Sequence, residues 1–118
     1  MRILITGGAG FIGCNLARRL AADGHETVVA DDFSSASWKN LIDYPGDVLT
    51  LDVAGGLSLL RAAGPFDAIF HEASITDTTV TDQHHMMHNN LDGFRQILDL
   101  AIEWGSRVVW ASSCSIYG

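Results

Sequence analysis

The chain has 118 residues, which suits one domain, and its 47% hydrophobic content supplies enough apolar surface for a core. Its 7 Lys and Arg and 14 Asp and Glu give a net charge of −7, which argues against nucleic-acid partners because neutralising phosphates needs clustered cations. The widely separated Cys14 and Cys114 form no disulfide framework, so we expect a cytoplasmic setting, with neither a signal peptide nor a membrane span.

Short apolar or β-branched runs alternate along the chain with segments that have helical spacing. The runs predict strands at 3–5, 26–31, 47–51, 67–71 and 107–111. The helical segments are 11–22, 57–63 and 82–104, with a weaker one near 38–42. This alternation predicts an α/β fold, a Rossmann-type doubly wound parallel sheet of five strands in the order 3-2-1-4-5. Ligands of such sheets bind beyond the carboxyl ends of the strands.

The longest helical segment, 82–104, has apolar residues three and four positions apart, and we expect Met86, Met87 and Phe94 to lie in the core. Three histidines stand near its start, His84, His85 and His88. Imidazoles without cysteine or carboxylate partners at ligand spacing favour a solvated helix start over a metal site. We therefore predict no bound metal.

Glycines follow the first strand at a spacing of three, in Thr6-Gly7-Gly8-Ala9-Gly10-Phe11-Ile12-Gly13. Gly7 permits a tight turn, Gly10 lets the backbone approach a diphosphate, and Gly13 lets the helix lie close to the sheet. The helix that starts at Phe11 and Ile12 offers free N–H groups to an anion. By itself the pattern also fits an ordinary strand-to-helix turn.

Acidic residues end the next two strands. Asp31 and Asp32 follow the second strand, where a carboxylate can accept the hydroxyls of an adenosine ribose. The same charge would repel a 2′-phosphate, which favours NAD over NADP. Asp52 and Val53 end the third strand, within reach of an adenine edge.

The glycine motif with Asp31 resembles the extended short-chain dehydrogenase/reductase superfamily, in particular its NAD-dependent epimerases and dehydratases of sugar nucleotides. The segment His71-Glu72-Ala73-Ser74 resembles the family's His-x-Ala-Ala segment, which passes beside the cofactor's diphosphate and nicotinamide ribose. Asn90 and Gly93 resemble the family's Asn-x-x-Gly, whose asparagine supports the active-site backbone. The segment from Ser112 to Gly118 resembles its Ser-Ser-x-x-x-Tyr-Gly. The resemblance implies that residues 1–118 are the N-terminal part of an NAD(P)-binding Rossmann domain.

A narrower resemblance links the chain to the subfamily of ADP-glyceromanno-heptose 6-epimerases. It rests on Phe70-His71-Glu72, Thr78-Thr79, Met86-Met87, Asn89-Asn90 and the segment Trp38-Lys39-Asn40-Leu41. That subfamily can use NADP, with a lysine near the 2′ position, and Lys39 could take this part. Because Asp31 and Asp32 oppose a 2′-phosphate, we expect NAD first and NADP second.

The resemblance assigns Ser113 the catalytic role of hydrogen-bonding the sugar, next to a Tyr-x-x-x-Lys general base. Neither Tyr44 nor Tyr117 has a lysine four residues later, so the pair is missing from these residues. We therefore expect the chain to stop before the catalytic helix and the substrate domain, and to have negligible epimerase activity alone. A nucleotide-linked sugar would bind only the longer form.

Three functions remain open. The chain could be the cofactor-binding part of an epimerase or dehydratase that acts by transient hydride transfer, a free-standing dinucleotide-binding module without catalysis, or a fragment that binds nothing. With no further strand beside it, 108–111 would form an exposed apolar edge, so we also expect self-association.

Overall fold

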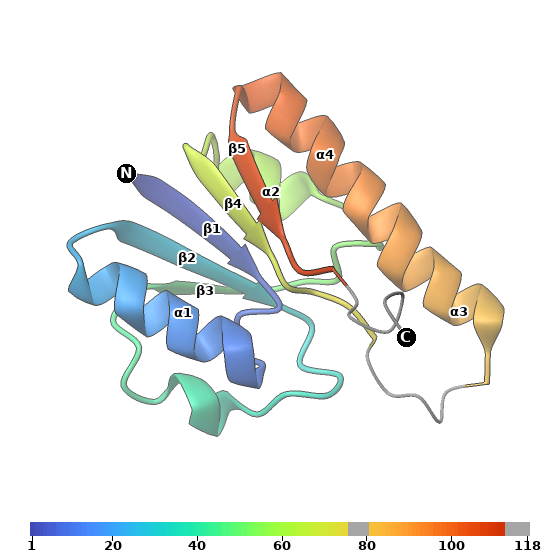
Figure 1. The fold of residues 1–118 in the computed structure, drawn as a ribbon, viewed down its shortest axis with the longest axis horizontal. Coiled ribbons are helices and arrows are strands. Elements are labelled where there is room, and N and C mark those ends of the chain that lie inside the picture. Colours follow the sequence, from blue (N-terminus) through green and yellow to red (C-terminus); the bar gives the residue numbers. More distant parts are fainter. Residues whose placement is uncertain (76–80, 113–118) are drawn as a thin grey trace.

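A computed structural model describes residues 1–75 and 81–112, and its centre is a parallel sheet (Figure 1). The strands are β1 (Arg2–Thr6), β2 (Glu26–Asp31), β3 (Asp47–Thr50), β4 (Ala68–His71) and β5 (Arg107–Trp110). They pair in parallel in the order β3-β2-β1-β4-β5. The predicted fold class and strand order are confirmed.

Helices cover both faces of this sheet. They are α1 (Phe11–Ala22), the 3₁₀ helix η1 (Trp38–Leu41), α2 (Ser58–Ala63), α3 (Gln83–Met87), the π-helical turn η2 (His88–Asp92) and α4 (Gly93–Trp104). Local sequence explains their ends: Asp82 caps α3 by accepting the N–H of His85, and Gly105 ends α4 in the left-handed conformation at φ 68°. None of the helices in residues 1–75 and 81–112 has the length and hydrophobicity of a membrane span.

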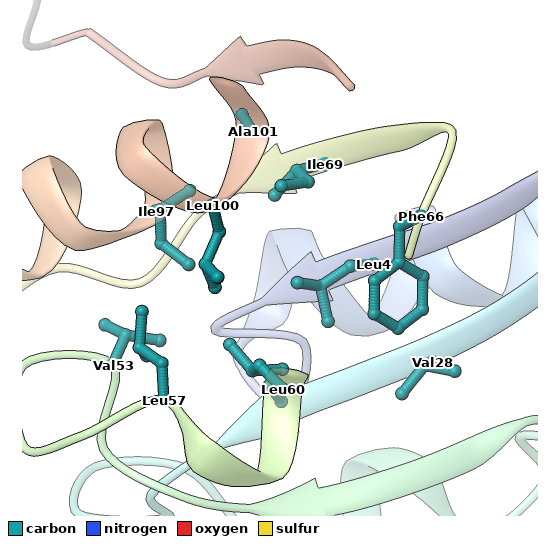
Figure 2. Packing of buried hydrophobic residues seen from close by; sticks show 11 residues of the cluster. Leu4, Val28, Val53, Leu57, Leu60, Phe66, Ile69, Ile97, Leu100 and Ala101 are labelled. Atoms are coloured by element: carbon teal, nitrogen blue, oxygen red, sulfur yellow. The ribbon is translucent and has the colours of Figure 1, made fainter. Parts of the chain in front are cut away.

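The alternation of side chains along β1 builds two cores. Leu4 faces one side of the sheet, where it packs with residues of α2 and α4 such as Leu60 and Leu100 (Figure 2). Ile3 and Ile5 face the other side, toward α1 and η1. A strand buried on both faces must be apolar throughout, which accounts for the unbroken run that begins the chain.

The predicted long helix 82–104 forms without a break in helical structure, with the π-helical turn η2 between α3 and α4. Only its second half packs on the sheet. Ile97, Leu100 and Ala101 are buried, whereas Met87 is exposed. The expectation of a core position is therefore wrong for Met87, and Met86 and Phe94 are only half-buried and belong to neither core. The reason is geometric, because α3 extends past the carboxyl ends of the strands, where no sheet lies beneath it (Figure 1).

Strand β5 is the edge of the described sheet, and its outer residues face solvent. The exposed fractions are 40% for Val109 and 55% for Trp110. The predicted apolar edge is present in the described part of the chain.

Candidate functional site

A cleft of about 630 Å³ opens at the carboxyl ends of the strands, between the loops that follow β1, β2, β3 and β4. Twelve of the predicted cofactor residues line it: Gly7, Gly10, Phe11, Ile12, Gly13, Asp31, Asp32, Asp52, Val53, Glu72, Ala73 and Ser74. The structure thus brings together residues from four separate segments of the chain, as the strand order predicts.

The glycines of the loop after β1 serve different purposes. A Cβ at Gly13 would lie 2.3 Å from the Gly7 carbonyl oxygen, so this glycine is required by close packing of α1. Gly7 has φ 67°, and a Cβ there would lie 2.7 Å from the backbone nitrogen of Ala73. At Gly10 the nearest atom would be the Gly7 carbonyl oxygen at 3.3 Å. A side chain at Gly10 would require this carbonyl to shift by only a few tenths of an ångström, so packing demands glycine far less there than at Gly13.

The first turn of α1 points its backbone into the cleft. Gly10 is the N-cap residue, and no side chain caps the helix. Phe11 and Ile12 are exposed, by 83% and 63%, although both are large and apolar. The first N–H groups of a helix together carry a partial positive charge, which suits an anionic ligand.

The two acids at the end of β2, Asp31 within the strand and Asp32 after it, have different surroundings. Asp31 accepts the N–H of Ala9 on Oδ2 and the N–H of Phe33 on Oδ1, both at 2.9 Å. Asp32 accepts the N–H and the hydroxyl of Ser34 on Oδ1, at 2.9 and 2.8 Å, and is exposed. Asp31 therefore organises backbone, whereas Asp32 presents a carboxylate to solvent.

Phe33 has φ 58°, which is costly for a bulky side chain. The Asp31 contact holds its N–H, and its ring stacks on that of Trp38 with centroids 4.2 Å apart. The stack joins the end of β2 to η1. Lys39, on η1, is exposed and does not line the cleft, which is lined in this region by Ser34, Ser35 and Ala36.

Asp52 continues the acidic rim after β3. Its Oδ1 accepts the N–H of Ala54 at 2.8 Å, a turn that keeps the carboxylate at the cleft. The next residue, Val53, is buried and packs against α4, where a Cβ at Gly93 would lie 3.1 Å from its side chain. Gly93 thus allows the helix to approach this wall.

A buried polar pair, Thr6 and His71, supports the segment after β4. His71 does not line the cleft; its Nδ1 shares a hydrogen bond of 2.7 Å with Thr6 Oγ1, which also accepts the N–H of Ala73 at 3.4 Å. Burial lowers the pKa of the His71 imidazole from 6.5 to about 4, so the ring is neutral near pH 7. Its ring stacks on Phe94, with centroids 5.2 Å apart. Burial also raises the pKa of the Glu72 carboxyl, which faces the cleft.

Asn90, on the π turn, lies behind the cleft and supports its wall. Its Oδ1 accepts the N–H of Ile75 at 2.6 Å, and its Nδ2 donates to the Ile75 carbonyl at 3.1 Å. These two hydrogen bonds give the N–H and the carbonyl of Ile75 the partners that a neighbouring strand would otherwise supply. The supporting role expected for Asn90 is compatible with this geometry.

Sequence reasoning missed four polar residues that line the cleft: Ser34 and Ser35 after β2, and His85 and Asn89. The last two come from one helical segment. They lie four positions apart, one helical turn, and that spacing next to Asn90 is the signal that could have found them. His88, by contrast, faces away and lies 3.1 Å from the Asp92 carboxylate on the exposed surface. Among the described residues, no group of three or more metal-binding side chains comes together. Ser113, the predicted catalytic residue, lies outside the described residues.

Comparisons with known proteins assign the chain to a family. The model of the NAD dependent epimerase/dehydratase family matches residues 3–118. A UDP-N-acetyl-alpha-D-glucosaminuronate decarboxylase from Bacillus cytotoxicus is 33% identical, over 99% of this chain and 38% of its own length. The chain therefore belongs to the NAD dependent epimerase/dehydratase family.

Solved structures agree with that assignment. The ADP-L-glycero-D-manno-heptose-6-epimerase of Helicobacter pylori is 38% identical, with a TM-score of 0.90 over 99% of this chain and 40% of that one. The Bordetella bronchiseptica enzyme WbmG, in complex with NAD, is 30% identical, with a TM-score of 0.88 over 100% of this chain and 39% of that one. The chain thus spans about two fifths of the length of the relatives it matches.

Proposed function

We propose that the cleft binds NAD, and that residues 1–118 form an NAD(P)-binding Rossmann domain of a sugar-nucleotide epimerase or dehydratase. The observation that carries the proposal is the contrast between Gly10 and Gly13. Gly13 is required by the fold, whereas a Cβ at Gly10 would meet only one backbone atom, at 3.3 Å. A glycine at the cleft that packing demands so much less than Gly13 is explained by a ligand whose phosphates approach the backbone.

The diphosphate would lie against the first turn of α1, where Phe11 and Ile12 border the cleft and no capping side chain competes for the helix N–H groups. The adenosine ribose would lie at the end of β2. There Oδ1 of Asp32 is held by Ser34, so Oδ2 can accept a ribose hydroxyl. Asp52 and Val53 would border the adenine.

NAD is the preferred cofactor in this proposal. A 2′-phosphate would have to lie near the carboxylates of Asp31 and Asp32, and like charges repel. Lys39, which could offset this charge, does not line the cleft. NADP is therefore the second choice, with Lys39 as the residue that would have to reach it.

The nicotinamide end would lie along residues 72–74, supported from behind by His71 and Asn90. When bound, the cofactor would accept a hydride from a sugar carbon and return it to the opposite face. The chain's own part is to position the reacting ends: Glu72 and Ser74 border the cleft there, and Ser113 keeps its predicted role toward the sugar. The substrate class is a nucleotide-linked sugar, such as the UDP- and ADP-linked sugars named for the relatives.

The sequence of these 118 residues lacks the Tyr-x-x-x-Lys pair that the resemblance makes the general base. Tyr44 donates its hydroxyl hydrogen to Thr27 Oγ1 at 2.8 Å and does not line the cleft. We propose that the isolated chain binds cofactor without turning over a sugar nucleotide. A free-standing dinucleotide-binding module is the alternative, favoured by the fact that the described residues already supply the glycine loop and both acidic strand ends. We further propose a cytoplasmic protein that self-associates through the exposed edge of β5.

A titration of the 118-residue chain with NAD, followed by calorimetry, tests the proposal. Gly10→Ala should keep the fold, because φ −72° and ψ 173° suit alanine, and should weaken NAD binding about tenfold or more. The matched control is Gly55→Ala, where the new Cβ would come no nearer than 3.5 Å to another atom. It should bind NAD like the wild type. Absence of heat and of a thermal shift at millimolar NAD would contradict the proposal.

A further inference from the structure

Ala9 lies in the glycine-rich loop between β1 and α1 (residues 7–10), and two side chains hold it, Asp31 at the end of β2 and Asn40 of η1. Its N–H donates to Asp31 Oδ2 at 2.9 Å, and its carbonyl accepts a hydrogen bond from Asn40 Nδ2 at 2.7 Å. The residue is fully buried. Two successive peptide groups, Gly8–Ala9 and Ala9–Gly10, are therefore fixed in orientation by side chains far away in the sequence.

Asn40 is itself held in place. Its N–H donates to the Ser37 carbonyl at 3.0 Å within η1, and its own carbonyl accepts a hydrogen bond from Arg18 Nη2 of α1. The side chain is half-buried and does not line the cleft. Asn40 thus ties together η1, α1 and the glycine-rich loop from outside the cleft lining.

The contact matters because of what lies on the other side of the same peptide group. The carbonyl of Ala9 and the N–H of Gly10 belong to one rigid plane. That N–H donates to the Gly7 carbonyl at 3.1 Å, and Gly10 is the N-cap of α1. Rotation of the Ala9–Gly10 peptide would therefore turn the N-cap away from the geometry that aims the first N–H groups of α1 into the cleft.

We propose that Asn40 is a positioning residue for the glycine-rich loop, which acts through the Ala9 carbonyl to set the affinity of the cleft for a diphosphate. The inference rests on the proposed cofactor function and adds a residue outside the cleft to the binding machinery. It also distinguishes Asn40 from Asp31, which holds the same loop but lines the cleft itself.

A matched pair of variants tests the inference in the 118-residue chain. Asn40→Ala removes the donor to Ala9, and Asn15→Ala removes an equal donor, because Asn15 Nδ2 also donates to a backbone carbonyl at 2.7 Å, that of Phe11. The Phe11 carbonyl lies inside helix α1, where the helix already fixes it. Each protein is titrated with NAD, with ADP and with adenosine, which has no phosphate.

We expect Asn40→Ala to weaken NAD and ADP binding about tenfold and adenosine binding by less than about twofold, and Asn15→Ala to change none of them. Asn40→Ala should also shift the amide resonance of Gly10 in the absence of ligand. Equal weakening for all three ligands would show general loosening and overturn the inference, as would unchanged affinities for NAD and ADP. If the wild type binds none of the ligands, the cofactor proposal fails instead, and an unmoved Gly10 resonance would then also refute the positioning contact.

Discussion

In the half of the cleft formed by the glycine-rich loop and the end of β2, backbone segments contact one another directly, and glycines make this possible. Gly13 leaves no room for a Cβ beside Gly7 and Gly8, and the Asp31 carboxylate joins two backbone N–H groups. Gly7 also leaves no room for a Cβ, but its close neighbour is Ala73, where the two halves meet. In the half formed by residues 72–75, single side chains support the backbone. Asn90 holds Ile75, and the Thr6–His71 pair holds Ala73.

The difference shows two ways of building a rigid wall. Closely packed backbone has no room for an added atom, so a substitution that adds one should lower the stability sharply and to the same extent at every pH. Support through a buried imidazole depends on the protonation state of that ring, so this wall should weaken as the ring becomes charged. Substitutions in each half can separate the two behaviours.

The largest effect is expected at Gly13. In Gly13→Ala the new Cβ would lie 2.3 Å from the Gly7 carbonyl oxygen and 2.7 Å from Gly8 Cα, so α1 and the glycine-rich loop must move apart. We expect a loss of about 3 kcal/mol in the free energy of unfolding, measured in urea, and none of it should depend on pH. Gly10→Ala is the internal comparison and should lose far less. Similar losses for the two variants would contradict the division of roles between these glycines.

The supporting side chain His71 should make stability depend on pH. The folded protein keeps the ring neutral down to about pH 4, whereas the unfolded chain takes up a proton below about 6.5. The contribution is therefore complete above pH 6.5 and is lost as the pH falls from 6.5 to 4, up to about 3 kcal/mol in the free energy of unfolding.

His71→Gln removes this titration, so the difference between wild type and variant should shrink as the pH falls through that window. His84→Gln, at an exposed position, is the matched control for losing a histidine. A difference that stays constant between pH 7 and pH 4 would show that the imidazole does not carry the effect.

The same contrast explains what sequence could and could not predict. The strands, the strand order and the glycine loop follow from local patterns, because a strand buried on both faces must be apolar and a tight turn needs glycine. The expectation for Met87 failed because helical periodicity describes which side of a helix is apolar, not where the sheet beneath it ends. His85 and Asn89 were missed because their place at the cleft depends on how far α3 and η2 extend beyond that sheet.

Lys39 illustrates a second feature that short sequence motifs do not predict, the position of η1 relative to the cleft. Its place after β2 suggested contact with a 2′-phosphate, but the position of η1 depends on the Phe33–Trp38 stack and on Asn40, which are contacts between residues that no short motif records. Lys39 lies outside the cleft lining, and its role toward NADP stays a prediction.

The smallest effect is expected at Asp32, where the choice between NAD and NADP is decided by charge rather than by packing. Asp32→Asn keeps an oxygen for the Ser34 contacts and removes the negative charge beside a 2′-phosphate. We expect the ratio of NADP affinity to NAD affinity to rise about fivefold, equivalent to about 1 kcal/mol, with stability nearly unchanged. Part of the change is a loss of NAD affinity, because an amide nitrogen replaces the Oδ2 that would accept a ribose hydroxyl. Asp43→Asn makes the same charge change at an exposed residue outside the cleft and should leave the preference as it is. If both variants raise NADP affinity equally, net charge rather than the acid after β2 sets the preference, and the backbone-built half of the cleft would then position the ligand without selecting it.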